Sequence, residues 1–515
     1  MSVYSLTDHP KSVLLDRARI PKTYREYLDI LKSMGEMIEI NDEVDWYLEL
    51  GAIFRHSAET LAPGAIFNNV KGCPRGFRAA DFGMGKSGTP GQPWGRLAVM
   101  LGLPPETDLM SIQRAYLNAM ETGTSHPPRM VDPASAPCKQ NKWLGDDIDI
   151  TKFPATIGHD GDGGRYINQA GINIVRTPDG KWTNWSCNRG MIVDRNHMTG
   201  LWMWFQHNGM IWRMWQKEGK DMPWAVAIGV SPAVATQAGS RCPDWVDEYD
   251  RASALLDAPI EMVKCETSDL LVPADCEIVI EGVLSHNEVE HEGPFGEYPG
   301  YMGDAPAPQP RQTITAVTFR NDPILPISLP GVPTDNCHVS QGFFNACDMA
   351  VALQAGGLPV IDANLMFESA LCWLVVRVYS DWHDTTGWTV DQLMNKIGVT
   401  YWTQHAQACT KILVVSEDID PADPKAVIWA FATRNHPQLG TYSFPDLEAF
   451  GSGLETYHSQ AELVRGKGGL VIYNCLTLQE GLGHPKKTVL SFEKNFPEAI
   501  QAKVRDNWAR WGFAQ

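Results

Sequence analysis

Two glutamates that can do acid and base chemistry, Glu292 and Glu297, stand in the segment EGPFGEYPG, which ends at Gly300. The glycines and prolines of this segment prevent a helix or a central strand, so we predict a shaped loop, where functional side chains concentrate. Two carboxylates held close together repel each other, so one can stay protonated near neutral pH while a nearby arginine keeps the other ionised. Because Glu288 and Glu290 lie close by, a solvated acidic turn is the alternative, and the residues alone favour it.

An arginine that can bind a carboxylate, Arg189, lies in the segment TNWSCNRG, which starts at Thr183. Its planar guanidinium can hold a carboxylate through two parallel hydrogen bonds. The alternative is an ordinary surface arginine whose aliphatic stem covers apolar neighbours. The segment alone does not separate the two.

A third set of residues, Asn184, His207 and Glu248, contains ligands for a divalent cation. An amide oxygen, an imidazole and a carboxylate together suit Mg²⁺ or Mn²⁺, especially where phosphate oxygens complete the coordination shell. Their spacing matches no local metal-binding motif, and a single histidine is more often a hydrogen-bonded side chain than a ligand. The spacing alone therefore leaves this site open.

The glycine-rich stretch FGMGKSGTPGQPWG, residues 82–95, imitates two nucleotide-binding motifs. It matches G-x-G-x-x-G, and its GKS resembles the end of a phosphate-binding P-loop. The P-loop needs a glycine where Ala80 stands, and Pro90 and Pro93 prevent the helix that the dinucleotide motif requires. We interpret the stretch as a plain loop.

The composition is that of a globular protein and excludes several classes. The length of 515 residues suggests about three structural units. A net charge of −18 without a basic stripe argues against nucleic-acid binding. Eleven scattered cysteines with no C-x-x-C pair fit neither a disulfide framework nor a zinc ribbon. The amino terminus has no apolar run and no stretch reaches ~18 apolar residues, so we expect a cytoplasmic protein without a signal peptide or a membrane span.

The local patterns predict a mixed α/β protein in which the balance of helices and strands changes along the chain. The amino-terminal part reads as a helix with a capping box at Thr23 and Glu26, a strand at residues 37–40 and a second helix at residues 110–120. The middle part has short β-runs with turn signals, typical of an antiparallel barrel or sandwich. We expect its strands at residues 171–176, 181–187, 191–193, 201–205, 225–230, 277–284 and 313–319.

The carboxy-terminal part alternates strands with helices, which is an α/β rhythm. We expect strands at residues 373–379 and 411–415, and helices at residues 341–355, 391–407 and 424–433. The last helix has an apolar face that must dock onto its own domain or onto a partner subunit; this face contains Ile500, Val504, Trp508 and Trp511. The 18 tryptophans, several of them between residues 182 and 215, fit either a large flat buried surface or a core rich in indoles.

Several segments, taken in order, point to one family. They are GGRYIN, TNWSCNRG, FQHN, DEYDRASALLDAPIEMVKCETSDLLVPADCEIVIEG, EGPFGEYPGY and ILPISLPGVPTD. In this order they resemble the UbiD family of prenylated-FMN-dependent decarboxylases, and looser similarity in KILVVSEDIDP and VIWAFATRNHP extends into the carboxy-terminal third. The resemblance covers most of the chain. It implies a split β-barrel that binds the flavin and an α/β domain that builds an oligomer.

By this resemblance, Glu292, Arg189 and Glu297 form the family's Glu-Arg-Glu network. Glu297 would protonate the carbon after CO2 leaves. Glu292 and Arg189 would orient the substrate carboxylate and maintain the protonation states. A neutral carboxylic acid is what this proton transfer needs, and a carboxylate pair supplies one by raising a pKa.

The resemblance also implies how the cofactor is held. A divalent metal, Mn²⁺ or Mg²⁺, would bridge the protein to the cofactor phosphate through Asn184, His207 and Glu248. A potassium ion would sit near the same phosphate, around Trp185 and residues 238–240. The other positions expected to contact the cofactor are Ser186, Cys187, Asn188, Arg189, Gln206 and, by a looser alignment, Lys396.

We therefore divide the chain into an amino-terminal α/β segment (1–125), a prenylated-FMN-binding split barrel (126–335), a linker helix (336–357) and a carboxy-terminal oligomerisation domain (358–515). The active site is expected between the barrel and the carboxy-terminal domain. A flavin prenyltransferase would supply the cofactor, and the chain would form a homodimer or a hexamer.

The expected reaction is reversible non-oxidative decarboxylation of an aromatic or heteroaromatic acid, with fused-ring phenazine or indole carboxylates among the candidates. One alternative is a cinnamic or acrylic acid decarboxylase of the same family, and another is a non-catalytic, flavin-dependent assembly subunit. The Leu-Pro-Gly at residues 329–331 stands at a substrate-facing place where the family varies. Cys187 and Asn188 also differ from the small apolar residues of some relatives, so both departures concern the substrate and not the reaction class.

Overall fold

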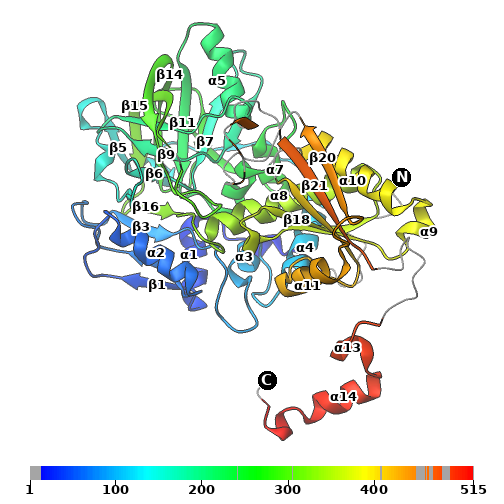
Figure 1. The fold of residues 1–515 in the computed structure, drawn as a ribbon. Helices are drawn as coiled ribbons and strands as arrows, with labels where there is room; N and C mark the ends of the chain where they lie inside the picture. Colours follow the sequence, from blue (N-terminus) through cyan, green and yellow to red (C-terminus); the bar gives the residue numbers. More distant parts are fainter. Residues whose placement is uncertain are drawn as a thin grey trace.

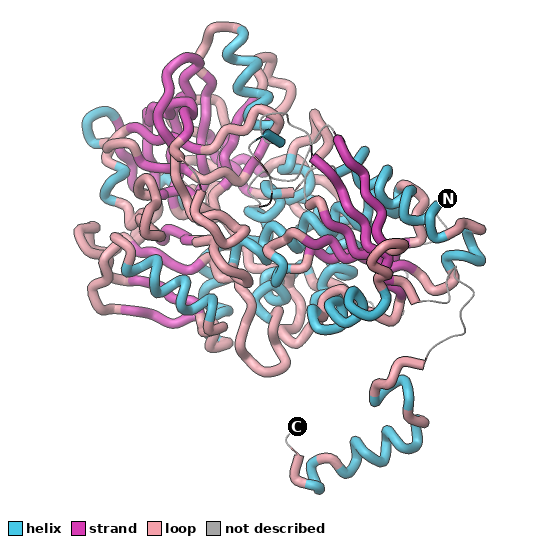
Figure 2. Tube along the Cα trace, viewed as in Figure 1, coloured by secondary structure: helices cyan, strands magenta, loops and turns pink. Residues whose placement is uncertain are grey.

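The computed structural model describes residues 13–240, 242–303, 305–405, 409–447, 457, 459, 461–462, 468–477 and 488–513. It confirms the mixed α/β class, with helices and strands interleaved along the chain (Figures 1 and 2). Three larger sheets organise the molecule, and the helices α7 and α8 lie in the middle, between the central and the carboxy-terminal sheets (Figure 1).

The amino-terminal sheet has the order β1-β2-β3-β16. Its last strand comes from far along the chain and pairs in parallel with β3, which joins the end of the central part to the beginning of the chain. The strands are β1 (Met37–Ile40), β2 (Gly64–Phe67), β3 (Arg78–Asp81) and β16 (Ile324–Ile327), and the helices are α1 (Tyr24–Ser33), α2 (Glu49–Glu59), α3 (Gly95–Met100) and α4 (Leu109–Thr122). The glycine-rich stretch at residues 82–95 contains no helix before α3, as predicted.

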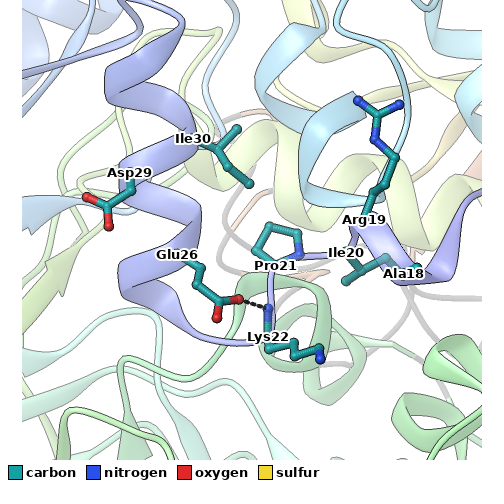
Figure 3. Close-up of a pocket in the computed structure, with 8 residues that line it drawn as sticks. All are labelled: Ala18, Arg19, Ile20, Pro21, Lys22, Glu26, Asp29 and Ile30. Carbon is teal, nitrogen blue, oxygen red and sulfur yellow. Dashed lines mark hydrogen bonds between the residues drawn. The ribbon is translucent and has the colours of Figure 1, made fainter.

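The capping box predicted at the start of α1 is half formed. The hydroxyl of Thr23 accepts from the backbone nitrogen of Glu26 at 3.1 Å, as expected for an N-cap. The carboxylate of Glu26, however, accepts from the backbone nitrogen of Lys22 at 2.7 Å instead of from that of Thr23 (Figure 3). The reciprocal hydrogen bond to Glu26 therefore comes from Lys22, one residue before the predicted N-cap Thr23.

The central sheet has nine strands in the order β6-β9-β10-β15-β14-β11-β7-β8, with β5 paired to β15. All its pairs are antiparallel, as the short β-runs predict. The strands are β5 (Asn141–Leu144), β6 (Tyr166–Asn168), β7 (Ile172–Arg176), β8 (Thr183–Ser186), β9 (Gly190–Ile192), β10 (His197–Gly200), β11 (Met222–Ile228), β14 (Ile278–Glu292) and β15 (Ala307–Phe319). Beside it lie the small sheet of β4 (Arg129–Met130), β12 (Glu261–Lys264) and β13 (Leu271–Pro273), and the helices α5 (His207–Lys217), α6 (Pro232–Ala235) and α7 (Glu248–Leu256).

The strand predicted at residues 201–205 is wrong. The ladder of β10 stops at Gly200, and the backbone nitrogen of Trp202 bonds to the side-chain oxygen of Gln309 at 2.9 Å instead of to a strand. The apolar side chain of Trp204 is 62% exposed, so the hydrophobic run does not mark a buried strand. It forms a turn that leads into α5.

The tryptophans serve the core more than a ligand surface. Trp182 and Trp224 are 1% and 0% exposed, and the indole nitrogen of Trp224 donates to Asn173 Oδ1 at 2.9 Å. Trp215 donates to the backbone oxygen of Arg176 at 2.7 Å. Buried indoles with satisfied N–H groups are packing residues, so this part of the sequence gives little support to a fused-ring substrate.

The carboxy-terminal sheet has the order β17-β18-β19-β21-β20. The strands are β17 (Val360–Leu365), β18 (Trp373–Val378), β19 (Lys411–Ser416), β20 (Thr441–Leu447) and β21 (Gly468–Cys475). The helices are α8 (Asn336–Ala355), α9 (Trp382–Thr386), α10 (Val390–His405), α11 (Pro424–Arg434), α13 (Phe492–Asn495) and α14 (Glu498–Asn507). The predicted α/β rhythm is confirmed in these elements.

The terminal helix α14 extends away from the rest of the chain together with α13 (Figures 1 and 2). Ile500 in α14 and Trp508 and Trp511 just after it are 46%, 40% and 49% exposed, so these apolar side chains stay largely exposed among the residues that the structure describes. Docking onto its own domain is therefore not observed, and docking onto a partner subunit stays a prediction. Among the described residues no helix combines the length and the apolar character needed to cross a bilayer.

One buried ion pair ties α1 to the central sheet. Glu277, which is fully buried next to the start of β14, accepts from Arg25 Nε and Nη2, both at 2.8 Å. The second carboxylate oxygen also accepts from the backbone nitrogen of Ile324 at 3.0 Å, at the start of β16. A single carboxylate thus links the amino-terminal helix, the central sheet and the returning strand.

Replacing Arg25 by alanine is expected to lower the stability by about 3 kcal/mol, because Glu277 stays buried without its main partner. Lys32→Ala is the matched control, since Lys32 makes only water-exposed pairs with Asp29 and Glu39, worth about 0–1 kcal/mol. Thermal and urea unfolding of both variants measure the difference. Equal unfolding midpoints would contradict the structural role of the buried pair.

Candidate active site

The structure brings Glu292, Arg189 and Glu297 together as one hydrogen-bonded unit. Arg189 follows β8, Glu292 ends β14, and Glu297 stands in the loop between β14 and β15. Arg189 donates to Glu292 through Nε at 2.8 Å and through Nη2 at 3.1 Å. Its Nη1 donates to Glu297 Oε1. The guanidinium therefore holds one carboxyl group in bidentate fashion and the other by a single contact.

Two aromatic residues shield this unit from water. The hydroxyl of Tyr166, which is fully buried, donates to Glu292 Oε1 at 2.8 Å. The ring of Phe295 lies 5.0 Å from the guanidinium of Arg189 and 4.3 Å, centre to centre, from the ring of Tyr166. The three ionisable groups are therefore shielded from water by these rings, so their charges interact strongly.

Burial and the neighbouring charges shift the pKa values of Glu297 and Arg189. Burial raises the pKa of Glu297, the positive charge of Arg189 opposes this, and the negative charge of Glu292 adds to it, so that the net pKa lies above the ordinary glutamate value. For Arg189, burial lowers the pKa, but the bonds to Glu292 and the charge of Glu297 outweigh it and raise the pKa. Arg189 therefore stays charged, and Glu297 keeps its proton to a higher pH than an ordinary glutamate does.

The three predicted metal ligands lie together at the edge of the central sheet. Asn184 lies in β8, and His207 and Glu248 are the first residues of α5 and α7. Asn184 Nδ2 donates to Glu248 Oε1 at 2.9 Å, and His207 Nδ1 lies 3.5 Å from the same oxygen. The backbone nitrogen of Trp185 donates to the other oxygen of Glu248 at 2.7 Å. Residues that are 64 positions apart in the sequence thus meet within hydrogen-bond distance.

Unpartnered buried oxygens mark the same region. Asn184 Oδ1, Ser186 Oγ and Ser240 Oγ are buried and have no hydrogen-bond partner among the residues that the structure describes. Buried polar atoms are normally satisfied, so three orphans on neighbouring predicted positions suit a bound group that would satisfy them. Within the described ranges no three His, Cys, Asp or Glu side chains converge to hold a metal ion, so an amide and oxygens of a ligand would have to complete this shell. The donor set fits a divalent metal beside a phosphate.

The remaining predicted cofactor positions fall into two groups. Asn188 Nδ2 donates to Gln206 Oε1 at 3.1 Å, directly before α5, so these two join the cluster. Cys187 is exposed, and its thiol approaches the backbone oxygen of Ala235 at 3.6 Å. Lys396 lies on α10 with its ammonium 4.6 Å from the ring centre of Trp388, and no described contact links it to the other predicted positions.

Sequence reasoning missed several residues of the site. Tyr166 belongs to the segment GGRYIN, so its place in the family pattern was a signal, but its bond to Glu292 was not predicted. Asp162 has no such signal; its charge adds to the raised pKa of Glu297. The small pocket drawn in Figure 3, between α1 and the residues before it, contains none of the predicted site residues.

Comparison with protein families decides the identity. Three models cover the chain in order: the 3-octaprenyl-4-hydroxybenzoate carboxy-lyase amino-terminal domain at residues 28–116, the Rift-related domain at 129–333 and the carboxy-terminal domain at 338–475. The chain belongs to the UbiD family. It is accordingly a decarboxylase of the carboxy-lyase class, and the non-catalytic alternative loses its support.

Two curated UbiD relatives are similar over nearly the whole length. The pyrrole-2-carboxylic acid decarboxylase of Pseudomonas aeruginosa is 34% identical over 494 residues, which is 95% of this chain and 98% of the relative. Ferulic acid decarboxylase 1 of Saccharomyces cerevisiae is 35% identical over 505 residues, with the same two shares.

Solved UbiD structures share the fold. The UbiD-class enzyme HmfF from Pelotomaculum thermopropionicum, in complex with FMN, is 26% identical with a TM-score of 0.78 and covers 94% of this chain and 99% of its own. An evolved dimeric form of that enzyme, in complex with prenylated FMN, is 25% identical with a TM-score of 0.75, over 93% and 99%.

Proposed function

We propose that this UbiD enzyme decarboxylates an aromatic or heteroaromatic carboxylic acid with prenylated FMN, reversibly and without net oxidation, and that Glu297 is the proton donor. The observation that supports this most is the Glu292–Arg189–Glu297 unit, in which one arginine is shared by two shielded carboxyl groups. Such a unit has one group that stays charged and one that favours the neutral acid. A decarboxylase needs this acid after CO2 has left.

Prenylated FMN, when bound, supplies the electron-accepting centre that takes up the electron pair left by departing CO2, which no side chain can do. The solved relative with prenylated FMN supports this choice of cofactor. Asn184, His207 and Glu248 would hold Mn²⁺ or Mg²⁺ against its phosphate, and the orphan oxygen of Ser240 fits the nearby potassium ion. Ser186, Cys187, Asn188, Arg189 and Gln206 would line the flavin, and Lys396 would reach the phosphate.

Residues of this chain supply the proton that replaces CO2 on the substrate carbon. When the bond between the substrate carbon and its carboxylate breaks, CO2 leaves, and the neutral Glu297 gives its proton to that carbon to form the new C–H bond. Glu297 becomes a carboxylate, whose charge Arg189 stabilises from hydrogen-bond distance. Glu292 keeps Arg189 in place through two hydrogen bonds. Water then returns a proton to Glu297, and the reverse sequence carboxylates the product at high CO2.

The substrate class rests on the relatives and leaves one second candidate. The pyrrole-2-carboxylic acid decarboxylase supports a heteroaromatic acid, and a fused-ring acid such as an indole or phenazine carboxylate extends this class. The ferulic acid decarboxylase supports a cinnamic-type acrylic acid instead. The segment at residues 329–331 is expected to face the substrate and to separate these two classes.

Assembly and cofactor supply complete the proposal. The uncovered apolar face of α14 suits a homo-oligomer, a dimer or a hexamer, in which a second copy covers it. A flavin prenyltransferase would supply the modified flavin before or during folding. The site is proposed to lie between the central and the carboxy-terminal domains, where α8 runs (Figure 1).

Asn184→Ala is expected to weaken metal binding by at least about 10-fold and to reduce the flavin that is retained, because it removes an oxygen ligand. The protein is produced together with a flavin prenyltransferase, the metal is measured by elemental analysis, and the released flavin by mass and absorption. The control Asn287→Ala changes an exposed asparagine of β14. Activity supported by ordinary FMN alone would refute the cofactor, and an unchanged metal content would refute the ligand.

Glu297→Gln is expected to lower kcat by roughly 10²–10⁴-fold while the flavin spectrum stays unchanged, because the amide cannot donate the proton. Since only the neutral acid donates, the parent's rate should fall as pH rises through the pKa of Glu297, later than for an ordinary glutamate. Glu290→Gln, on the preceding strand β14 and paired with Arg311, is the control and should stay active. A fully active Glu297→Gln enzyme would overturn the proposed role.

A panel of acids will assign the substrate class. Pyrrole-2-carboxylate, indole-3-carboxylate and a phenazine carboxylate are compared with cinnamate and ferulate, by CO2 release and by deuterium incorporation at the carbon that loses CO2. We expect the highest kcat/KM with a heteroaromatic acid. A higher kcat/KM for cinnamate would instead favour the acrylic acid alternative.

A further inference from the structure

Glu297 stands at the turn of a small β-hairpin whose backbone is bonded on both strands. The bridge between Gly296 and Met302 closes the hairpin, and the backbone nitrogen of Glu297 donates to the oxygen of Tyr301 at 2.9 Å. The backbone nitrogen of Gly303 donates to the oxygen of Phe295 at 2.9 Å. These bonds fix the hairpin internally, but they do not fix it relative to Arg189.

A histidine of α8 holds the residue after Glu297. His338 is fully buried, and its Nε2 donates to the backbone oxygen of Tyr298 at 2.7 Å. On its other edge, Nδ1 lies 2.8 Å from Asp335 Oδ1, so the ring cannot turn away without breaking this contact. The Asp335 carboxylate in turn accepts from Arg55 Nη1 at 2.7 Å. The chain of contacts runs from α2 through α8 to the hairpin.

A second histidine and aspartate hold the residue before Glu297. The fully buried carboxylate of Asp162 accepts from the backbone nitrogen of Gly296 at 3.1 Å and from that of His159 at 2.9 Å. The ring of His159 packs directly against the backbone of Gly296. The contact is so close that a Cβ at position 296 would lie 2.5 Å from two atoms of the ring. His159 Nε2 donates to the backbone oxygen of Pro330 at 2.8 Å.

The charge state of the aspartate beside His338 supports a fixed arrangement. Burial raises the pKa of Asp335, but the hydrogen bond from His338 and the charge of Arg55 outweigh it and hold the pKa below the ordinary value. Asp335 is therefore an ionised anchor at neutral pH. It also caps α8, since it accepts from the backbone nitrogen of Cys337 at 3.0 Å.

We propose that the two pairs His338–Asp335 and His159–Asp162 are positioning residues, which hold the hairpin from both sides so that Glu297 stays aimed at the reacting carbon. The inference rests on the proposed role of Glu297 as proton donor. Neither histidine touches the Glu292–Arg189–Glu297 contacts; each acts on the backbone of a neighbour of Glu297. A proton donor must lie within hydrogen-bond reach of the carbon, and a shift of about 1 Å can cost on the order of 10²-fold in rate.

His159 also connects the hairpin to the segment expected to face the substrate. Its bond to Pro330 lies within residues 329–331, and Arg55 donates to the backbone oxygen of Leu329 at 3.2 Å and, directly after the segment, to that of Val332 at 2.7 Å. The proton donor and the substrate-facing segment are thus held by shared side chains. A change in one segment is expected to move the other.

The test replaces His338 by two amides of different reach. The nitrogen of asparagine falls near the position of Nδ1, so His338→Asn loses the bond to Tyr298, whereas glutamine falls near Nε2, so His338→Gln keeps it. We expect His338→Asn to lower kcat by about 10-fold or more with KM and the flavin spectrum unchanged, and His338→Gln to restore most of kcat. His126→Asn, from an exposed pair with Asp257, is the control and should leave kcat unchanged.

The outcomes separate the inference from the proposed function. If Glu297→Gln is inactive while His338→Asn keeps the parental kcat, only the positioning role is overturned; if Glu297→Gln is active, the proton donor itself is wrong. A lower melting temperature with parental kcat in the folded, flavin-loaded enzyme would mean a purely structural histidine. If His338→Asn does not fold, His159→Asn takes its place in the test, because this variant loses the bond to Pro330. A parental kcat of His159→Asn would then overturn the proposal.

Discussion

The site depends on one guanidinium shared by two carboxyl groups. Arg189 uses Nε and Nη2 for Glu292 and Nη1 for Glu297, and all three side chains are largely shielded from water. One positive charge cannot compensate two buried negative charges, and a surplus charge in a medium of low polarity is costly. Glu297 receives a single contact from Arg189, and its pKa lies above the ordinary glutamate value. The proposed role of Glu297 as the acid therefore rests on which carboxyl group receives two hydrogen bonds from Arg189.

The fold supplies the three members of this unit from a few rigid elements. The long strand β14 starts in the core beside Glu277 and ends at Glu292, and its register against β15 shifts after Leu284, where the partly exposed end begins. Arg189 comes from the short turn between β8 and β9, which lie near opposite ends of the strand order. Glu292 has the fixed position of a strand residue, whereas Glu297 lies in the longer loop between β14 and β15. This is why it needs anchors on both sides.

The sequence predicted which segments form helices and strands better than it predicted which residues contact each other in the fold. Regular periodicity located β1 and α10 to within a few residues, because local pattern and final structure agree there. It failed at residues 201–205, where an apolar run ends in an exposed turn, since hydrophobicity alone does not show which backbone atoms find partners. The Glu-Arg-Glu unit came from the family pattern and not from the residues, which favoured a solvated acidic turn. The roles of His338 and Asp162 left no trace in the sequence, because the groups that they hold on either side of Glu297 are backbone atoms.

Arg189, for which we propose a catalytic role, and the proposed metal ligand Asn184 lie at two ends of one short segment. Asn184 and Arg189 are five residues apart, so any displacement at one end reaches the other through a short, bonded chain. The backbone oxygen of Asn188, next to Arg189, accepts from the side chains of Asn168 at 2.8 Å and of Asn173 at 3.0 Å. Asn173 is itself fixed by the buried indole of Trp224. The tryptophan-rich core therefore supports the proposed chemistry indirectly, because it fixes the backbone that contains both the proposed metal ligand Asn184 and the proposed catalytic arginine Arg189.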